Sequence, residues 1–215
     1  MIFDLDGTTL YTLDDISESF NQALKEFGFP EKDKEAIRMG VGRGFRMLVN
    51  NIVPEETPEE LKDRLALRYK AIYAERYAEK TRPYEGMEET LKALQEEGIQ
   101  MAVNSNKSDI FVKGLIGKNF PDVAFSDVLG SIEGIALKPD PEAAYRIIAK
   151  MGLKKEEVAY VGDSDIDMKT AKNAGMKAVG CLWGYRDRKT LEESGADLLI
   201  GKPEELLKLI KEETI

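Results

Sequence analysis

The sequence of 215 residues contains no histidine. This absence excludes a Ser-His-Asp triad, a Cys-His pair and a phosphohistidine intermediate. It also excludes metal sites that depend on imidazole ligands. Any chemistry carried out by this chain must therefore use carboxylates, hydroxyls, lysines, backbone amides or a bound ion.

Cysteine and long apolar runs are also scarce. Cys181 is the only cysteine, so an intrachain disulfide is impossible, and its apolar setting "MKAVGCLW" favours a buried, inert thiol over a reactive one. No apolar run is long enough to span a bilayer. Strand-like sequence begins at Met1 and leaves no room for a signal peptide, so the expected localisation is cytoplasmic.

Positive charge is in deficit, because 31 basic residues face 40 acidic ones and the formal net charge is −9. Non-specific binding to nucleic acid or to an anionic membrane is therefore not expected. No segment indicates a protein partner. If the ligand is a small anion, a few local cations must overcome the overall repulsion.

Buried-strand patterns alternate with helical ones over most of the chain. "MIFDL", "IQMAVN", "EEVAYVG" and "MKAVGCLW" are typical of strands, with a weaker one at "ADLLI". Helical patterns are predicted near the following ranges: 87–97, 107–116, 140–151, 165–174 and 203–212. Such alternation implies parallel pairing, so the predicted fold class is α/β, a Rossmann-like doubly wound sheet.

One stretch, residues 12–81, contains only helical and loop patterns. Apolar residues recur there at helical spacing, and they include Tyr69, Tyr73 and Tyr77, which are expected in the core between these helices. The stretch follows the first strand directly. The sequence therefore predicts an α/β core of residues 1–11 and 82–215 with an inserted helical domain of residues 12–81.

Polar clusters follow the predicted strands, at the edge where open α/β sheets bind ligands. They are "DLDGT", "NSNK" and "GDSDID", with "LKPDP" before a helix. Asp4 and Asp6 are two apart on an extended segment and point the same way. Asp163 and Asp167 are four apart at a strand-to-helix junction, so both can face one point.

Four converging carboxylates would repel one another unless a cation lies between them. Oxygen ligands favour a hard divalent ion, and Mg²⁺ is the best match. Each cluster also has a simpler interpretation. "DGTT" would serve as a turn, "SDID" as a capping box, Ser105 and Asn106 as helix caps, and Lys138 as a solvated lysine. What favours a site is that all four occur together, in order, at strand ends.

These residues resemble the four motifs of the haloacid dehalogenase superfamily of phosphatases. "IFDLDGT" corresponds to the first motif, "MAVNS" to the second, the lysine of "LKPDP" to the third and "GDSDID" to the fourth. The resemblance covers the whole chain, with a helical cap inserted after the first motif. Within the superfamily the chain is most similar to phosphoglycolate phosphatase-like enzymes.

The resemblance implies a role for each motif residue. Asp4 would be the nucleophile that forms an aspartyl-phosphate, and Asp6 the general acid and base. The metal ligands would be Asp4, the backbone carbonyl of Asp6, Asp163 and, through water, Asp167. Ser105 and Lys138 would hold the phosphoryl oxygens, with Asn106 beside them in the substrate site.

The chain departs from its relatives in the segment that enters the cap, where Thr9 and Tyr11 replace the usual leucine and aspartate. In the cap itself, "GVGRG" at 40–44 follows a helix rather than a strand, so a dinucleotide-binding loop is not expected. The loop is either a plain turn or a substrate loop. In the second case Arg43 would bind a carboxylate such as that of 2-phosphoglycolate.

The predicted function is a Mg²⁺-dependent phosphatase for a small phosphorylated metabolite. A pyrophosphatase of the same superfamily is an alternative. A mutase like β-phosphoglucomutase is disfavoured by the missing cap-linker histidine, and a dehalogenase by the presence of the second aspartate. The non-enzymatic alternative, an inactive metal-binding module, is disfavoured because Asp4 and Lys138 are both present.

Overall fold

A six-stranded parallel sheet forms the centre of the molecule in the computed structural model, which describes residues 1–212. Across the sheet the strands are β5 (Asp127–Ser131), β4 (Ala102–Ser108), β1 (Ile2–Phe3), β6 (Ala159–Gly162), β7 (Lys177–Cys181) and β8 (Leu198–Ile200). Along the chain, β4 and β5 are added on one side of β1, and β6, β7 and β8 are then added on its other side. The polar loops at the carboxyl ends of β4, β1 and β6 consequently lie side by side.

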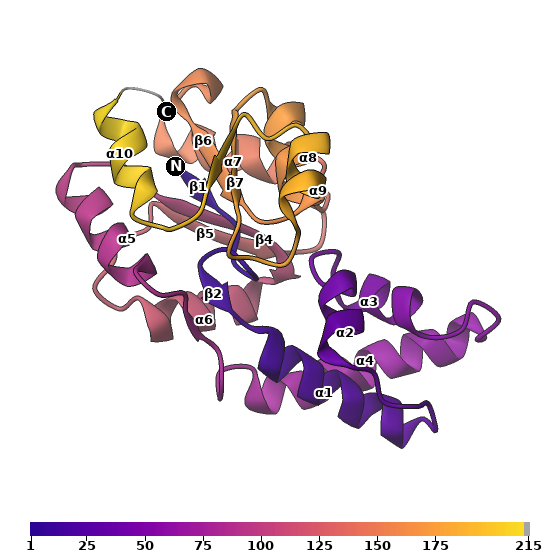
Figure 1. Cartoon of the computed structure of the whole chain (residues 1–215). Helices are drawn as coiled ribbons and strands as arrows, with labels where there is room; N and C mark the ends of the chain where they lie inside the picture. The colour runs from indigo at the N-terminus through magenta and orange to yellow at the C-terminus, as the bar shows by residue number, and fades with distance from the viewer. Residues whose placement is uncertain (213–215) are drawn as a thin grey trace.

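Helices cover both faces of this sheet because successive strand residues point to opposite sides. Phe3 packs with α5 (Met87–Glu96), α6 (Asp109–Asn119) and α10 (Glu205–Lys211), whereas Ile2 packs on the opposite face. That face is covered by α7 (Glu142–Met151), α8 (Asp165–Ala174) and α9 (Arg188–Glu193) (Figure 1). Both faces are buried, which confirms the predicted doubly wound α/β class.

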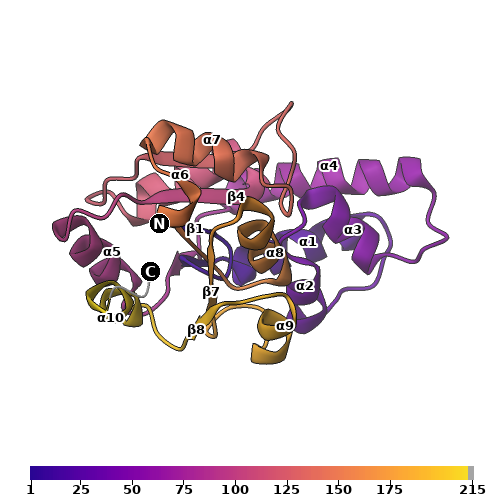
Figure 2. The same ribbon diagram turned by 90° about the horizontal axis from the view of Figure 1, so that it is seen from above.

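The stretch after the first strand forms a separate group of helices around a second apolar cluster, which Phe111 and Tyr185 of the core also join. Its helices are α1 (Leu13–Glu26), α2 (Lys34–Gly40), α3 (Phe45–Ile52) and α4 (Glu59–Arg76). Tyr69 and Tyr73 are buried in that cluster, as the sequence predicted, and Tyr77 packs against it. Figure 2 shows these helices gathered on one side of the molecule, with α5 and α10 on the other.

The chain enters and leaves the helical group through two short paired strands. In these, β2 (Leu10–Tyr11) runs antiparallel to β3 (Arg82–Pro83). Buried Asp15 fastens this junction by accepting hydrogen bonds from the backbone of Lys80 and Thr81 and from the Thr81 hydroxyl. We propose that residues 12–81 act as a cap domain on a core of residues 1–11 and 82–215.

Several elements differ from the sequence-based expectation. Sequence patterns missed β5, whose "DVLGS" contains Asp, Gly and Ser, which are untypical of strands, and they also missed β2, β3 and α9. A short 3₁₀ turn (Lys155–Glu157) before β6 was missed as well. The helix expected from residue 107 begins at Asp109, because β4 continues to Ser108.

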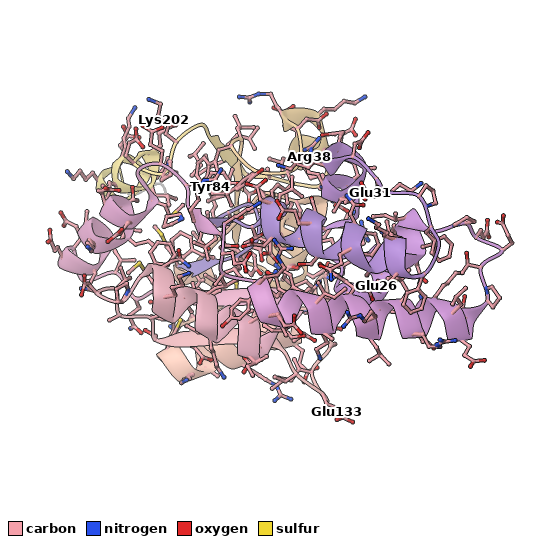
Figure 3. The ribbon with its side chains drawn as sticks, turned by 90° about the horizontal axis from the view of Figure 1, so that it is seen from below. Glu26, Glu31, Arg38, Tyr84, Glu133 and Lys202 are labelled. Atoms are coloured by element: carbon pink, nitrogen blue, oxygen red, sulfur yellow. The ribbon has the colours of Figure 1, made fainter. Side chains whose placement is uncertain are left out.

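Cys181 is fully buried, as expected for a structural thiol. Within residues 1–212, none of the helices has the length and apolar character that crossing a membrane requires. Charged side chains cover the surface. Figure 3 shows Lys202 at one end of the molecule, Glu26 and Glu31 toward the cap end, and Glu133 projecting from the loop after β5.

Candidate active site

Four predicted site residues converge at the carboxyl end of the sheet. Lys138, in the loop before α7, places its Nζ 2.7 Å from Asp4 Oδ1 and 2.7 Å from Asp167 Oδ1. Asp4, Asp163 and Asp167 each present a carboxylate oxygen within 4.8 Å of the others. All four side chains are buried. The sequence alone had left a solvated Lys138 open as the simpler interpretation, and the structure excludes it.

The ammonium group of Lys138 has a complete set of acceptors. Besides the two carboxylates, it donates to the Asn104 carbonyl at 3.2 Å, which accounts for its three N–H groups. Burial opposes the charged form of this lysine, but Asp167 and Asp4 outweigh that effect and raise its pKa. Lys138 therefore remains a cation between two carboxylates.

Asn106 is a linker rather than a helix cap. Its Oδ1 accepts from the Lys138 backbone N–H at 2.8 Å, and its Nδ2 donates to the carbonyls of Lys138 and of Gly42 in the cap. The cap position of α6 belongs to Ser108. The helix-cap interpretation of Ser105 and Asn106 was therefore wrong, because β4 extends past both residues. Ser105 is buried beside them.

Asp163 is oriented by two donors from other loops. Tyr185 N–H lies 2.7 Å from its Oδ2 and Thr8 Oγ1 lies 2.8 Å from its Oδ1. Burial, reinforced by the charge of Asp167, raises the pKa of Asp163 to about 7. Burial and Asp167 also raise the pKa of Asp4. The ionised forms of Asp4 and Asp163 are therefore disfavoured until a cation binds between them.

Asp167 has two functions in the structure. With Ser164 it forms the capping box predicted from "SDID" at the start of α8. Its other oxygen pairs with Lys138. The capping interpretation and the cluster interpretation are thus both correct, because the two carboxylate oxygens point to different partners.

Asp6 lies outside the three-carboxylate cluster and has its own cation, which the sequence analysis missed. Lys107 Nζ lies 2.9 Å from Asp6 Oδ1 and 3.0 Å from Oδ2, and Thr12 donates to Oδ1 at 2.6 Å. Lys107 is the last residue of "NSNK", so its place at a predicted strand end was the available signal.

Glycines permit the close approach of the loops. A methyl group on Gly7 or Gly184 would overlap the side chain of Asp163, and one on Gly162 would overlap Asp167. Gly7 also has φ +93°, which is unfavourable for other residues. The cluster geometry therefore requires small residues in the surrounding loops.

Gly7→Ala is expected to displace Asp163 and to weaken, by roughly tenfold or more, the affinity of the carboxylate cluster for a divalent cation such as Mg²⁺. Gly98→Ala is the matched control, since Gly98 also has a positive φ (+74°) but nothing within 4 Å of the new methyl. Both variants should lose about 1–2 kcal/mol for the backbone alone. Urea unfolding and Mg²⁺ titration compare them, and equal Mg²⁺ affinities would show that Gly7 does not position Asp163.

A small cavity of about 40 Å³ lies between the cap and the core. The core lines it with polar groups and the cap mainly with apolar ones. The core residues are Asp4, Asp6, Ser105, Asn106 and Lys107, and the cap residues are Ile16, Val41, Gly42, Gly44, Phe45, Leu48 and Tyr69. Asp4 and Asp6 thus face the same space. A group bound there would contact both carboxylates.

Arg43 does not line this cavity. Its guanidinium lies 3.0 Å from Asp165 Oδ2 at the start of α8 and is partly exposed. Asp165 attracts Arg43 to the outside of the cap–core junction, although its neighbours Gly42 and Gly44 both line the cavity. The structure therefore separates Arg43 from Ser105 and Asn106, which do line the cavity.

A second arginine, Arg186, also links the two parts, but it belongs to the core and binds the cap. Arg186, in the loop after β7, donates to the carbonyls of Arg38, Met39 and Val41 at 3.0–3.1 Å. Figure 3 shows Arg38 where the cap meets the C-terminal part of the core. The end of α2 and the "GVGRG" loop are consequently held over the site.

Comparisons with known proteins identify the family. Residues 1–181 match the family described as haloacid dehalogenase-like hydrolase. A phosphoglycolate phosphatase of Mannheimia succiniciproducens is 33% identical, over 97% of this chain and 96% of its own length. Phosphoglycolate phosphatase 1 of Pseudomonas aeruginosa is 32% identical, over 96% of this chain and 78% of its own length.

Solved structures give the same result. A crystal structure described as a predicted phosphoglycolate phosphatase from Haemophilus somnus superimposes with a TM-score of 0.90 at 29% identity. The match covers 97% of this chain and 96% of that one. The likeness therefore includes both the sheet and the helical cap.

Proposed function

The chain belongs to the haloacid dehalogenase-like hydrolase family, and from this premise we propose that it is a Mg²⁺-dependent phosphomonoesterase that uses Asp4 as its nucleophile. The observation that carries the proposal is the buried group of Asp4, Asp163 and Asp167 around Lys138. Carboxylates packed in this way repel one another, and the cost is offset only when cations lie among them.

The donor set suits Mg²⁺, because all the candidate ligands are oxygens. Asp4 and Asp163 would hold the ion directly, with the backbone carbonyl of Asp6, while Asp167 is expected to act through water. When bound, the ion would neutralise charge on the transferring phosphoryl group. Thr8 and Tyr185 keep the Asp163 carboxylate in the required orientation.

The protein residues supply the rest of the chemistry. A carboxylate oxygen of Asp4 attacks phosphorus while the bond to the leaving oxygen breaks, and Asp6 gives that oxygen a proton. Water then attacks the aspartyl-phosphate, Asp6 takes a proton back, and Asp4 is released with inorganic phosphate. Ser105 would bind the phosphoryl oxygens and Lys138 would supply positive charge beside Asp4, since phosphoryl transfer depends mainly on positioning and charge neutralisation.

We propose a small substrate, and 2-phosphoglycolate in particular. A cavity of about 40 Å³ has room for only a few water molecules, so a closed cap suits a substrate with few atoms. The names of the relatives point to the same compound. Asp4 and Lys138 are both present and paired, which argues against an inactive metal-binding module.

Phosphate release from a panel of phosphorylated metabolites tests this function. The panel includes 2-phosphoglycolate, ethyl phosphate, glucose 1-phosphate and pyrophosphate, each with Mg²⁺ and with excess EDTA. We expect the highest kcat/KM for 2-phosphoglycolate and loss of turnover in EDTA. Undiminished turnover in EDTA would contradict the proposed metal dependence, and a preference for pyrophosphate would contradict the proposed substrate class.

Because the pKa of Asp163 is raised, the affinity for Mg²⁺ is expected to depend on pH. In the metal-free protein the folded state keeps a proton on Asp163 up to about pH 7, whereas the unfolded chain loses it near 3.8. This group therefore makes unfolding easier as pH rises through that window. Mg²⁺ must displace the proton, so its affinity rises over the same window.

Urea unfolding at pH 5 and pH 8, with and without Mg²⁺, measures this linkage. The stabilisation by Mg²⁺ should be larger at pH 8. In Asp163→Asn the pH dependence of that stabilisation should shrink, because the titrating ligand is gone. Stabilisation by Mg²⁺ that is equal at both pH values in the parent protein would contradict the assignment of Asp163 as a ligand.

A further inference from the structure

Lys107 is a buried cation on the wall of the cavity between cap and core. Its side chain is only 4% exposed, and its Nζ lies 2.9 Å and 3.0 Å from the two oxygens of Asp6. The same nitrogen lies 4.8 Å from the centre of the Tyr73 ring in the cap. The ammonium group is thus held between a core carboxylate and the face of a cap aromatic ring.

Among the residues that line the cavity, Lys107 alone is positively charged. Lys138 is buried below, where three oxygens use its N–H groups, and Arg43 is paired with Asp165 outside. Lys107 has only the two oxygens of Asp6 as hydrogen-bond acceptors among the described residues. An ammonium group has three N–H donors, so one donor remains for a ligand.

The cap side of the cavity adds no charged side chain; its one polar side chain among the lining residues is Tyr69. Ile16, Val41, Phe45 and Leu48 make that wall apolar. Gly44 precedes α3, and no side chain caps the first-turn amides of this helix, so its positive end also borders the cavity. The helix end carries only a partial charge, so Lys107 is the one full positive charge in the cavity lining that a second negative group on a phosphate ester could meet.

We infer that Lys107 is a specificity-determining residue that selects phosphate esters carrying a carboxylate on the carbon next to the ester oxygen. The inference rests on the proposed phosphatase function and names the residue that distinguishes its substrates. Asp4 fixes where phosphorus must lie, and Lys107 is on the same small cavity, next to Asp6. A two-carbon phospho-acid carries its carboxylate close to its phosphorus and so keeps both groups within one small cavity, where Lys107 could bridge the substrate carboxylate and that of Asp6.

A binding experiment separates this role from catalysis. In the Asp4→Asn background, calorimetry with Mg²⁺ compares 2-phosphoglycolate with ethyl phosphate, which has a methyl group in place of the carboxylate. The parent background should bind 2-phosphoglycolate more tightly. Lys107→Met should remove that preference, by about 10- to 100-fold for a buried, charge-assisted contact, and leave ethyl phosphate affected much less. Lys107→Arg should restore part of it.

Two matched variants act as controls. Arg43→Met removes the other candidate cation, and Lys113→Met removes an exposed one that pairs with Asp109. Both should keep the preference for 2-phosphoglycolate. If Arg43→Met abolishes it while Lys107→Met does not, the inference is wrong and Arg43 binds the carboxylate. Circular dichroism checks folding, and Lys107→Gln provides a second variant should Lys107→Met be misfolded.

The outcomes test the role of Lys107 separately from the proposed phosphatase function. Equal loss for both ligands in Lys107→Met would mean that Lys107 acts only by holding Asp6, which overturns the inference. A parent that binds both ligands equally would overturn it too. Failure of the parent enzyme to hydrolyse either ester would contradict the proposed function, whereas the binding preference would still report on Lys107.

Discussion

Asp4→Asn is expected to lower phosphate release on the order of 10⁴-fold or more, because the amide cannot attack phosphorus and form the covalent intermediate. Asp4 is the one cluster carboxylate that is paired with Lys138 and also lines the cavity where substrate would bind. Single-turnover phosphate release from 2-phosphoglycolate with saturating Mg²⁺ measures the loss.

Asp122→Asn is the matched control for Asp4→Asn. Asp122 is exposed and its nearest cation, Lys92, is 3.8 Å away, so the same chemical change there should leave turnover unchanged. Urea unfolding of both variants verifies that the fold persists. Turnover by Asp4→Asn within tenfold of the parent would assign the nucleophile elsewhere.

Lys138→Met is expected to lower the free energy of unfolding by roughly 3–5 kcal/mol in the absence of metal, the usual cost of removing one partner from a buried ion pair. The side chain of Lys138 is 3% exposed and contacts two buried carboxylates. Methionine keeps much of the apolar stem, so the loss reports on charge more than on packing. Urea denaturation in EDTA measures it.

Lys150→Met controls for loss of a lysine as such, because Lys150 pairs with Asp127 on the surface and should change stability by about 0.5 kcal/mol or less. Mg²⁺ should recover part of the loss in Lys138→Met, since it brings positive charge to the same carboxylates. Equal stability of the two lysine variants would mean that the carboxylates around Lys138 are not ionised together.

The sequence was enough to predict five of the six strands of the parallel sheet and the convergence of their loops. Alternating buried strands and helices fixed parallel pairing, and parallel pairing brings the ends of β1, β4 and β6 to one edge. Asp4 and Asp163, far apart along the chain, could therefore be placed together from topology alone. The edge strand β5 was missed because it is only half-buried, so its residues need not be apolar.

The partners of the long cationic side chains could not be predicted in the same way. Lys107 and Arg43 both lie beside the predicted site in sequence, and each can extend in several directions. Lys107 is held by burial beside Asp6 and Tyr73, and Arg43 is held by the partly buried carboxylate of Asp165. Both outcomes depend on how the cap packs on the core, which local sequence does not specify.

The aspartyl-phosphate on Asp4 is the central claim, and trapping it tests that claim most directly. The enzyme is mixed with 2-phosphoglycolate and Mg²⁺, quenched in acid, reduced with borohydride and digested for mass spectrometry. We predict that Asp4, and no other aspartate of the N-terminal peptide, is converted to homoserine, and only when substrate and metal are both present. Rapid turnover under the same conditions with Asp4 unreduced, or with reduction at Asp6 instead, would contradict the account.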